Sequence, residues 1–268
     1  MGLFSRNFNK PGPGVSKDEP RKKGFARFIE LFFRDFGDLV KLNLIFCICA
    51  LPSVAAFITG LTGFYSAIAF GAALLLAFPI GGALVAYVYY ITKMMRDDPS
   101  YVWYEFKRKF KENFLQASPA GILCAAFIYA QVLLWASLLF GEETSDILWF
   151  IIAFLSLLLF GMIVPYIFMH FAYITLGTFR IIKNSILMAF GYLPRSFMGS
   201  VLGSVLWIAF VLFLPDSMLI FPLMILIGGS LSVLMCLSWV WKPFNEYFKV
   251  EETLTEQKNE NSEDTEID

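Results

Sequence analysis

The stretch KMMRDDPSYVWYEFKRKFKENFLQAS, residues 93–118, interrupts a chain that otherwise consists largely of long apolar runs. The 268 residues are 58% hydrophobic and 16% charged, whereas an ordinary soluble domain has roughly 45–50% apolar residues. The charges cluster between the apolar runs, while a soluble helical protein carries them along one side of every helix. The sequence therefore predicts an all-α, polytopic membrane protein.

Six apolar runs are each close to or above the roughly 20 residues that a helix needs to cross a bilayer core. Prolines inside these runs predict kinks, because neighbouring helices can satisfy the carbonyl groups that a proline leaves unpaired. These prolines are Pro52, Pro79, Pro165 and Pro222. The sequence predicts six transmembrane helices, near residues 42–60, 64–92, 119–140, 147–174, 198–214 and 217–241.

All the lysines and arginines fall on one side of this topology. The 21 basic residues lie in the two terminal segments, in residues 93–118, or between the fourth and fifth predicted spans. The opposite loops, near 61–63, 141–146 and 215–216, carry only acidic charges. By the positive-inside rule, both termini are expected in the cytoplasm.

The two terminal segments differ in composition. Residues 1–23 combine proline and glycine with basic residues, which predicts a flexible cytoplasmic arm. Residues 251–268 hold eight acidic residues and one lysine, so the rest of the chain has 20 basic and 14 acidic residues. We expect one membrane domain over 24–250 and a disordered acidic tail over 251–268. A basic body of this kind predicts anionic lipid as its partner, and no nucleic acid.

Three polar segments show apolar residues at helical spacing. Residues 25–39 predict a helix in the membrane interface or, alternatively, a helix packed against the spans on the soluble side. The other two segments predict cytoplasmic elbow helices that lie flat at the interface. Their repeated stripe, 76 residues apart, suggests a duplicated unit, which is either architectural or a transporter repeat. The stripes are Trp103, Phe106, Phe110, Phe114 and Phe179, Ile182, Ile186, Phe190.

Chemistry-bearing residues are scarce in the apolar runs. No Asp, Glu, Lys or Arg lies within a predicted span away from its ends, which argues against an ion-coupled transporter. Asp97 and Asp98 are expected to begin the first elbow helix, with their carboxylates near its positive end. The spacing of Cys47 and Cys49 suits neither a disulfide nor a metal pair. We expect no enzymatic activity, no cofactor and no metal site.

A few polar or small residues inside the spans are expected to pack helices. Gln131 is expected to hydrogen-bond between helices. His170 has no carboxylate or second ligand within one turn of its helix, so we expect a buried packing histidine. Gly199 and Gly203 form a small-xxx-small stripe, which predicts close packing within the monomer or, alternatively, in a dimer.

Several short motifs carry a family resemblance. They are Gly37-Asp38-Leu39 with Asn43, Leu51-Pro52, Gly81-Gly82-Ala83 with Tyr89-Tyr90, Arg96-Asp97-Asp98 with Tyr101, and Phe106 with Phe110-Lys111-Glu112-Asn113-Phe114 and Gln116. Together they resemble the YesL-like family of bacterial integral membrane proteins, a domain of unknown function. The resemblance extends over about residues 1–250. It supplies no catalytic residues. It implies a multi-pass protein of the bacterial plasma membrane and, by gene neighbourhood alone, a role near carbohydrate uptake.

These observations lead to one preferred hypothesis and two others. The preferred one is a non-enzymatic accessory or assembly protein that acts with a sugar transporter or sensor subunit. The second is an uncoupled carrier or channel for a small neutral solute such as a sugar, and the third is an intramembrane enzyme. Under the first hypothesis, the candidate cytoplasmic contact residues are Trp103, Lys107, Arg108, Lys111 and Asn113.

Overall fold

The computed structural model describes residues 24–63, 66–98, 100–141, 147–213 and 220–257. These residues form helices and contain no strand. The helices are α1 (Phe25–Arg34), α2 (Phe36–Leu61), α3 (Ser66–Leu76), α4 (Phe78–Met95), α5 (Val102–Phe140), α6 (Ile147–Tyr173), α7 (Thr178–Gly191), α8 (Leu193–Phe213), α9 (Ile220–Leu223), the π-helical segment η1 (Met224–Gly228) and α10 (Gly229–Phe248).

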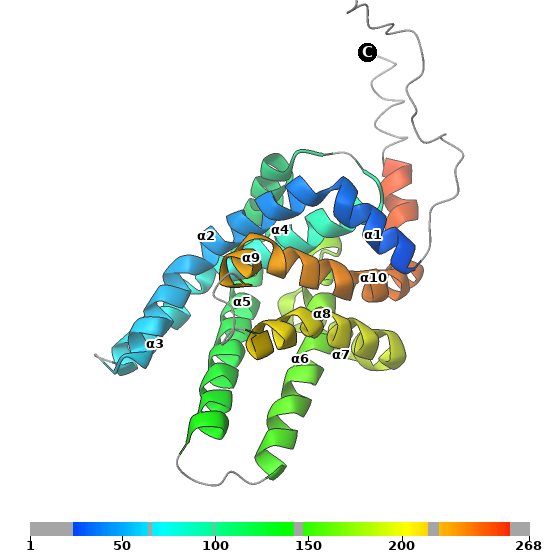
Figure 1. The fold of residues 1–268 in the computed structure, drawn as a ribbon. Helices are drawn as coiled ribbons and strands as arrows, with labels where there is room; N and C mark the ends of the chain where they lie inside the picture. The colour runs from blue at the N-terminus through cyan, green and yellow to red at the C-terminus, as the bar shows by residue number, and fades with distance from the viewer. Residues whose placement is uncertain (1–23, 64–65, 99, 142–146, 214–219, 258–268) are drawn as a thin grey trace, which may run out of the picture.

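α4 lies at the centre of the molecule (Figure 1), and every residue from Ile80 to Met94 except Leu84 is buried. It contacts α2, α5, α6 and α10. α5 and α6 lie side by side and extend together away from α1, while α2 and α3 form a separate hairpin (Figure 1). We call the end that holds α1, the junction of α4 and α5, and the last turns of α10 the charged end.

α4 and α5 touch backbone to backbone. A Cβ atom at Gly81 would lie 2.0 Å from the carbonyl oxygen of Ala117, and one at Gly121 would lie 2.2 Å from the nitrogen of Gly81. Small residues permit such close approach in membranes, where association depends on packing rather than on a hydrophobic driving force between helices. This contact makes α4 and α5 the most intimately packed pair in the core.

The second apolar run is interrupted at Ala77, where α3 and α4 are bent by 40°. The Ala77 N–H bonds to the Leu74 carbonyl, one residue short of its α-helical partner. That partner is the carbonyl of Ala73, which instead accepts a 2.6 Å hydrogen bond from the hydroxyl of Ser53 in α2. Pro79, in the first turn of α4, has no N–H to continue the ladder. The predicted kink at Pro79 is confirmed.

Four helical segments are long and apolar enough to cross a membrane: α2, α5, α6 and Met224–Phe248. α3 and α4 make a fifth if the bent pair is one span. The fifth predicted span, 198–214, corresponds to α8 (Leu193–Phe213), whose part Leu193–Ala209 is a shorter apolar helix when only the fully described residues are considered. The all-α, multi-pass architecture is supported, while a count of six spans stays a prediction.

α5 differs from the expected arrangement. It runs without interruption from Val102 through Pro119 to Phe140, so the first predicted elbow and the third predicted span are one helix. The stripe expected on one face is also split, since Phe106 is 3% exposed and Trp103 is 64% exposed. Packing against α4 on both sides of Pro119 explains the continuity. The second predicted elbow is a separate helix, α7.

Two other boundaries differ from the prediction. The helix expected over 25–39 ends at Arg34, and α2 begins at Phe36, because the chain turns at Asp35. Residues 250–257 are helical, although disorder was expected from residue 251. Asn245 explains this local order, because its side-chain oxygen accepts a 2.9 Å hydrogen bond from the N–H of Glu251. Residues 1–23 and 258–268 lie outside the described part of the chain.

Candidate functional site

The charged end is organised by the turn that follows α4. The N–H of Asp98 bonds to the Lys93 carbonyl at 3.3 Å, and the N–H of Asp97 bonds to the Met94 carbonyl at 3.1 Å. These are the two bonds of a Schellman motif, in which glycine usually occupies the left-handed position. Asp97 occupies it here, with φ of 62°. The expectation that Asp97 and Asp98 begin a helix is therefore wrong: they follow the C-terminal end of α4.

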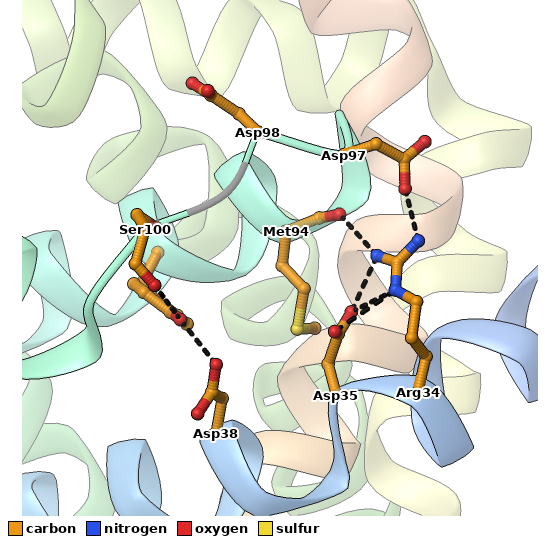
Figure 2. A pocket seen from close by; sticks show the side chains of 8 residues that line it. Arg34, Asp35, Asp38, Met94, Asp97, Asp98 and Ser100 are labelled. Carbon is orange, nitrogen blue, oxygen red and sulfur yellow. Dashed lines mark hydrogen bonds and ion pairs between the residues drawn. The ribbon is translucent and has the colours of Figure 1, made fainter. Parts of the chain in front are cut away.

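Two arginines of α1 explain why an aspartate is found at this turn. Arg27 and Arg34 each place a guanidinium nitrogen 2.5 Å from a carboxylate oxygen of Asp97. Figure 2 shows the pair of Arg34 and Asp97. Partial burial acts to raise the pKa of Asp97, but hydrogen bonds from the two arginines lower it below its ordinary value. Arg34 also donates to Asp35, and this bond, with a smaller effect from Asp97, raises the pKa of the Arg34 guanidinium. The pairs hold α1 against the end of α4.

A pocket of about 280 Å³ opens beside these ion pairs (Figure 2). Its acceptors are already engaged: Asp38 accepts from the hydroxyl of Tyr90 and from Lys41, both at 3.0 Å. The described residues contain no group of three or more side chains arranged to hold a metal ion. The pocket is therefore polar, but its carboxylates are used within the protein. It is lined by Arg34, Asp35, Asp38, Tyr90, Met94, Asp97, Asp98 and Ser100.

A buried charge triad joins α4 to α5 next to this pocket. Glu105 is only 7% exposed, and its two carboxylate oxygens are paired separately, with Lys93 at 2.7 Å and with Arg108 at 2.5 Å. Arg108 also donates a 3.1 Å hydrogen bond to the hydroxyl of Tyr89. A charge taken out of water is tolerated when every oxygen is paired. The triad therefore fixes the first turns of α5 on α4.

Arg96 connects the charged end to α6 and α10. Its guanidinium lies 5.4 Å from the ring centroid of Tyr173 and 5.7 Å from that of Trp241, which is within the range of a cation–π interaction. The indole N–H of Trp241 donates to Glu251 at 3.2 Å. This chain of contacts links the turn after α4 to the helical residues 250–257.

The predicted contact residues do not share one surface. Trp103, Lys107 and Lys111 are exposed on the outer face of α5, and the two lysines form no ion pair with a described residue. Arg108 is half-buried and is paired with Glu105 in the triad. Asn113 is buried and donates to the Lys109 carbonyl at 3.1 Å, so the assignment of Asn113 to an exposed contact is wrong. Helical geometry places it about 120° around the axis from Lys107 and about 160° from Lys111.

The polar residues expected to pack helices lie within the core. The amide nitrogen of Gln131 donates to Ser156 of α6 at 2.8 Å, so the predicted interhelical bond is confirmed. His170 is fully buried, and its Nδ1 lies 2.8 Å from the Tyr166 carbonyl and 3.1 Å from the hydroxyl of Ser185 in α7. His170 Nε2 has no hydrogen-bond partner among the described residues. The prediction of a packing histidine is confirmed.

Gly199 and Gly203 lie against α10 of the same chain. A Cβ at Gly199 would lie 2.7 Å from a methyl carbon of Val240, and one at Gly203 would lie 3.1 Å from Cβ of Cys236. Ser232 also donates a hydrogen bond to the Gly203 carbonyl. In the structure, this stripe packs two helices within the monomer.

The Gly81–Gly121 contact, the Asp97 turn and the buried triad all lie in one continuous part of the chain. Residues 39–134 match the family model described as "Protein of unknown function, DUF624". The DUF624 match runs from α2 into the second half of α5 and includes Asn43. It supports a domain of unknown function for this region, while the YesL-like resemblance stays a prediction. No curated protein and no solved structure matches the chain.

Sequence reasoning missed the triad and the Asp97 pairs for a physical reason. Lys93 and Glu105 are separated by 12 positions, and they meet only because the turn after α4 reverses the chain. One available signal was the position of Lys93, four residues after Tyr89 on a helix that is otherwise apolar. A lysine at such a position needs a partner when the helix is buried on all sides.

Proposed function

We propose that this chain is a non-enzymatic accessory or assembly protein of the plasma membrane, which binds a partner protein through the outer face of the first turns of α5. This face consists of Trp103, Lys107 and Lys111, with Tyr101 and Tyr104 beside it. Sugar-uptake or sensing machinery is the proposed partner class, and the resemblance to the YesL-like family is what suggests it. The charged end is proposed to face the cytoplasm, as the distribution of basic residues predicts.

The continuity of α5 is the observation that carries this proposal. Its 39 residues extend about 58 Å at 1.5 Å per residue, whereas the hydrocarbon core is about 30 Å thick. The first turns, which contain the charges, therefore extend beyond the core. Tyr104 is 65% exposed and Trp103 is 64% exposed in this part, and tyrosine and tryptophan are enriched at protein interfaces.

Affinity purification of the full-length protein in mild detergent tests the proposal. We expect the variant Trp103→Ala/Lys107→Glu/Lys111→Glu to keep its elution volume and melting temperature, because all three side chains point outward. The amount of transporter or sensor subunit that co-purifies with this variant should fall at least tenfold. Lys183→Glu on α7, another exposed lysine, is the matched control and should retain the partner. Equal recovery of the partner by the wild type, the triple variant and Lys183→Glu would contradict the proposal.

An uncoupled carrier for a small neutral solute is the second candidate, and the interrupted helices favour it. The bend between α3 and α4 and the π-helical segment η1 are two breaks in apolar helices, and discontinuous helices often surround substrate sites in transporters. Saturable sugar flux into proteoliposomes, lost in Asn43→Ala and retained in Lys183→Glu, would support the carrier. Absence of such flux would leave the accessory role as the better account.

A further inference from the structure

The segment η1 interrupts an otherwise α-helical element. α9 precedes Met224–Gly228, and α10 follows it, so only these five residues have π geometry. The flanking residues Leu223 and Gly229 both have α-helical dihedral angles. A π-helical turn accommodates one more residue than an α-helical turn, and such turns often occur at functional positions. The side chain of Asn43, from α2, contacts the π-helical segment at Ile225.

The amide of Asn43 bridges two backbone groups of the interrupted helix. Its nitrogen donates to the Ile225 carbonyl at 2.7 Å, and its oxygen accepts from the N–H of Ser230 at 3.1 Å. Ser230 is five positions after Ile225, so this donor and acceptor are the pair that a π-helical bond would join. The side-chain amide of Asn43 therefore lies between this carbonyl and this N–H and hydrogen-bonds to both, in place of a direct backbone bond.

The surroundings of Asn43 are built to hold it there. Tyr87 of α4 donates to its oxygen at 2.8 Å. Gly229 leaves room for this oxygen, because a Cβ at that position would lie 2.4 Å from it. In return, the Ser230 hydroxyl donates to the Leu39 carbonyl of α2 at 2.7 Å. The two helices thus each donate a side-chain hydrogen bond to the backbone of the other.

Burial changes abruptly along this element. Pro222, Leu223, Ile225 and Leu226 are exposed, while Ile227, Gly228 and Ser230 are buried. A conversion of η1 to α-helix with α10 fixed would rotate the preceding residues by about 100°. The rotated part is the exposed end, so the buried end need not move. In the α register, Gly229 would donate to Ile225, and Ser230 would donate to Leu226, so these backbone groups stay paired.

We propose that Met224–Phe248 is a two-register helix, and that the Asn43 amide latches it in the π register. Withdrawal of the amide lets η1 become α-helical and turns residues 222–226, most of which are exposed, about the helix axis. Asn43 keeps Tyr87 as a partner in both registers. Ser230 keeps α10 attached to α2 through the Leu39 carbonyl. The latch is independent of the partner-binding face on α5.

Spin-label distances in lipid vesicles test the latch, in a variant without the four native cysteines. One label pair sits at Leu223→Cys and Ile48→Cys, both exposed positions, and a reference pair sits at Trp239→Cys and Ile48→Cys. In Asn43→Ala, we expect the first distance to change by up to about 8 Å, the chord of a 100° turn on a helix 10–12 Å wide. The reference distance should stay unchanged. An unchanged first distance in Asn43→Ala would overturn the proposal.

Two further variants separate the latch from general damage. Ser53→Ala removes the other buried bond from α2 to an interrupted helix and should leave both distances unchanged. Deletion of Leu226 removes the extra residue, so we expect a folded, monodisperse protein with both distances close to those of the wild type. Deletion of Leu234, a fully buried residue of α10, should abolish folding. If both deletions abolish folding equally, the two-register model is wrong.

Discussion

Two segments carry similar stripes of apolar residues but are attached to the core in different ways: residues 93–118, which include the first turns of α5, and residues 174–197, which include α7. In the first, Phe106 packs inward, Glu105 is paired with two cations, and the backbone at Ala117 touches Gly81 of α4. In the second, Phe179 is 81% exposed. α7 is attached by a buried face of Ile181, Ser185, Met188 and Ala189.

The comparison shows that the neighbouring helix determines which way a stripe of apolar residues faces. α4 offers two glycines, Gly81 and Gly82, against which α5 and its phenylalanines can pack. No glycine of α6 lies against α7 in the same way, and the nearest polar tie is the bond between Ser185 and His170. Charge pairs and close backbone contact therefore fix the first segment, while a narrow apolar face and one hydroxyl fix the second. Substitutions in the first segment should therefore lower the stability of the protein more than substitutions in the second.

The largest effect is expected where the backbones of α4 and α5 touch. Gly81→Leu places a side chain where a Cβ alone would lie 2.0 Å from the Ala117 carbonyl oxygen. We expect a loss of about 3 kcal/mol or more of stability, because overpacking at a backbone contact has no flexible neighbour to move. Gly191→Leu, at the end of α7, has no atom within 4 Å of its Cβ and is the control. Size-exclusion profiles and melting temperatures measure both, and similar losses would remove the contrast between the segments.

A smaller but still large effect is expected from breaking the buried triad. Glu105→Gln leaves Lys93 buried without its close counter-charge, and loss of one partner of a buried pair costs about 3–5 kcal/mol. The double variant Lys93→Met/Glu105→Leu should recover much of this loss. Glu246→Gln breaks the exposed pair with Arg195 and should cost about 1 kcal/mol or less. Thermal melting compares them; equal effects of Glu105→Gln and Glu246→Gln would contradict the burial argument.

A fall in pH should weaken the attachment of the first segment to the core before it weakens that of the second. The folded-state pKa of Asp97 is lowered from its ordinary value of 3.8. Its contribution to stability is thus present above about pH 4 and is lost as the pH falls through the folded-state pKa. Asp97→Asn should lower the melting temperature at pH 7 and should flatten its decline below pH 4. Parallel wild-type and variant curves from pH 3 to pH 7 would show that Asp97 does not carry this dependence.

The smallest effect is expected in the second segment. Ser185→Ala removes one hydrogen bond to His170, whose Nδ1 keeps the Tyr166 carbonyl as a partner. A loss of about 1 kcal/mol is expected, since a typical net contribution is 0.5–1.5 kcal/mol. Differential scanning fluorimetry measures it, with Ser204→Ala, which breaks a bond within α8, as the comparison. A loss as large as that of Glu105→Gln would show that α7 is anchored as firmly as α5.

Composition and spacing predicted the features that depend on local sequence. The apolar runs indicated membrane helices, Pro79 indicated the break before α4, and Gln131 indicated a bond between helices. These signals depend on a residue and its immediate neighbours. The extent of α7 followed from its own stripe in the same way.

The remaining features depend on residues far apart in the chain. The continuity of α5 through Pro119 depends on the surface of α4, and the role of Asp97 depends on two arginines more than 60 positions away. The π-helical segment has no local signal, because Asn43 reaches it from a helix about 180 positions earlier. Pattern reasoning along one helix at a time cannot join such pairs.

The position of Gly121 within α5 has a mechanical consequence. It is the midpoint of Val102–Phe140, with 19 residues, or about 29 Å of helix, on either side. The contact with Gly81 therefore divides α5 into two arms of equal length. The first arm is also held on α4 by the buried triad. A load applied at the aromatic tip thus passes into α4 before it reaches the far end of α5.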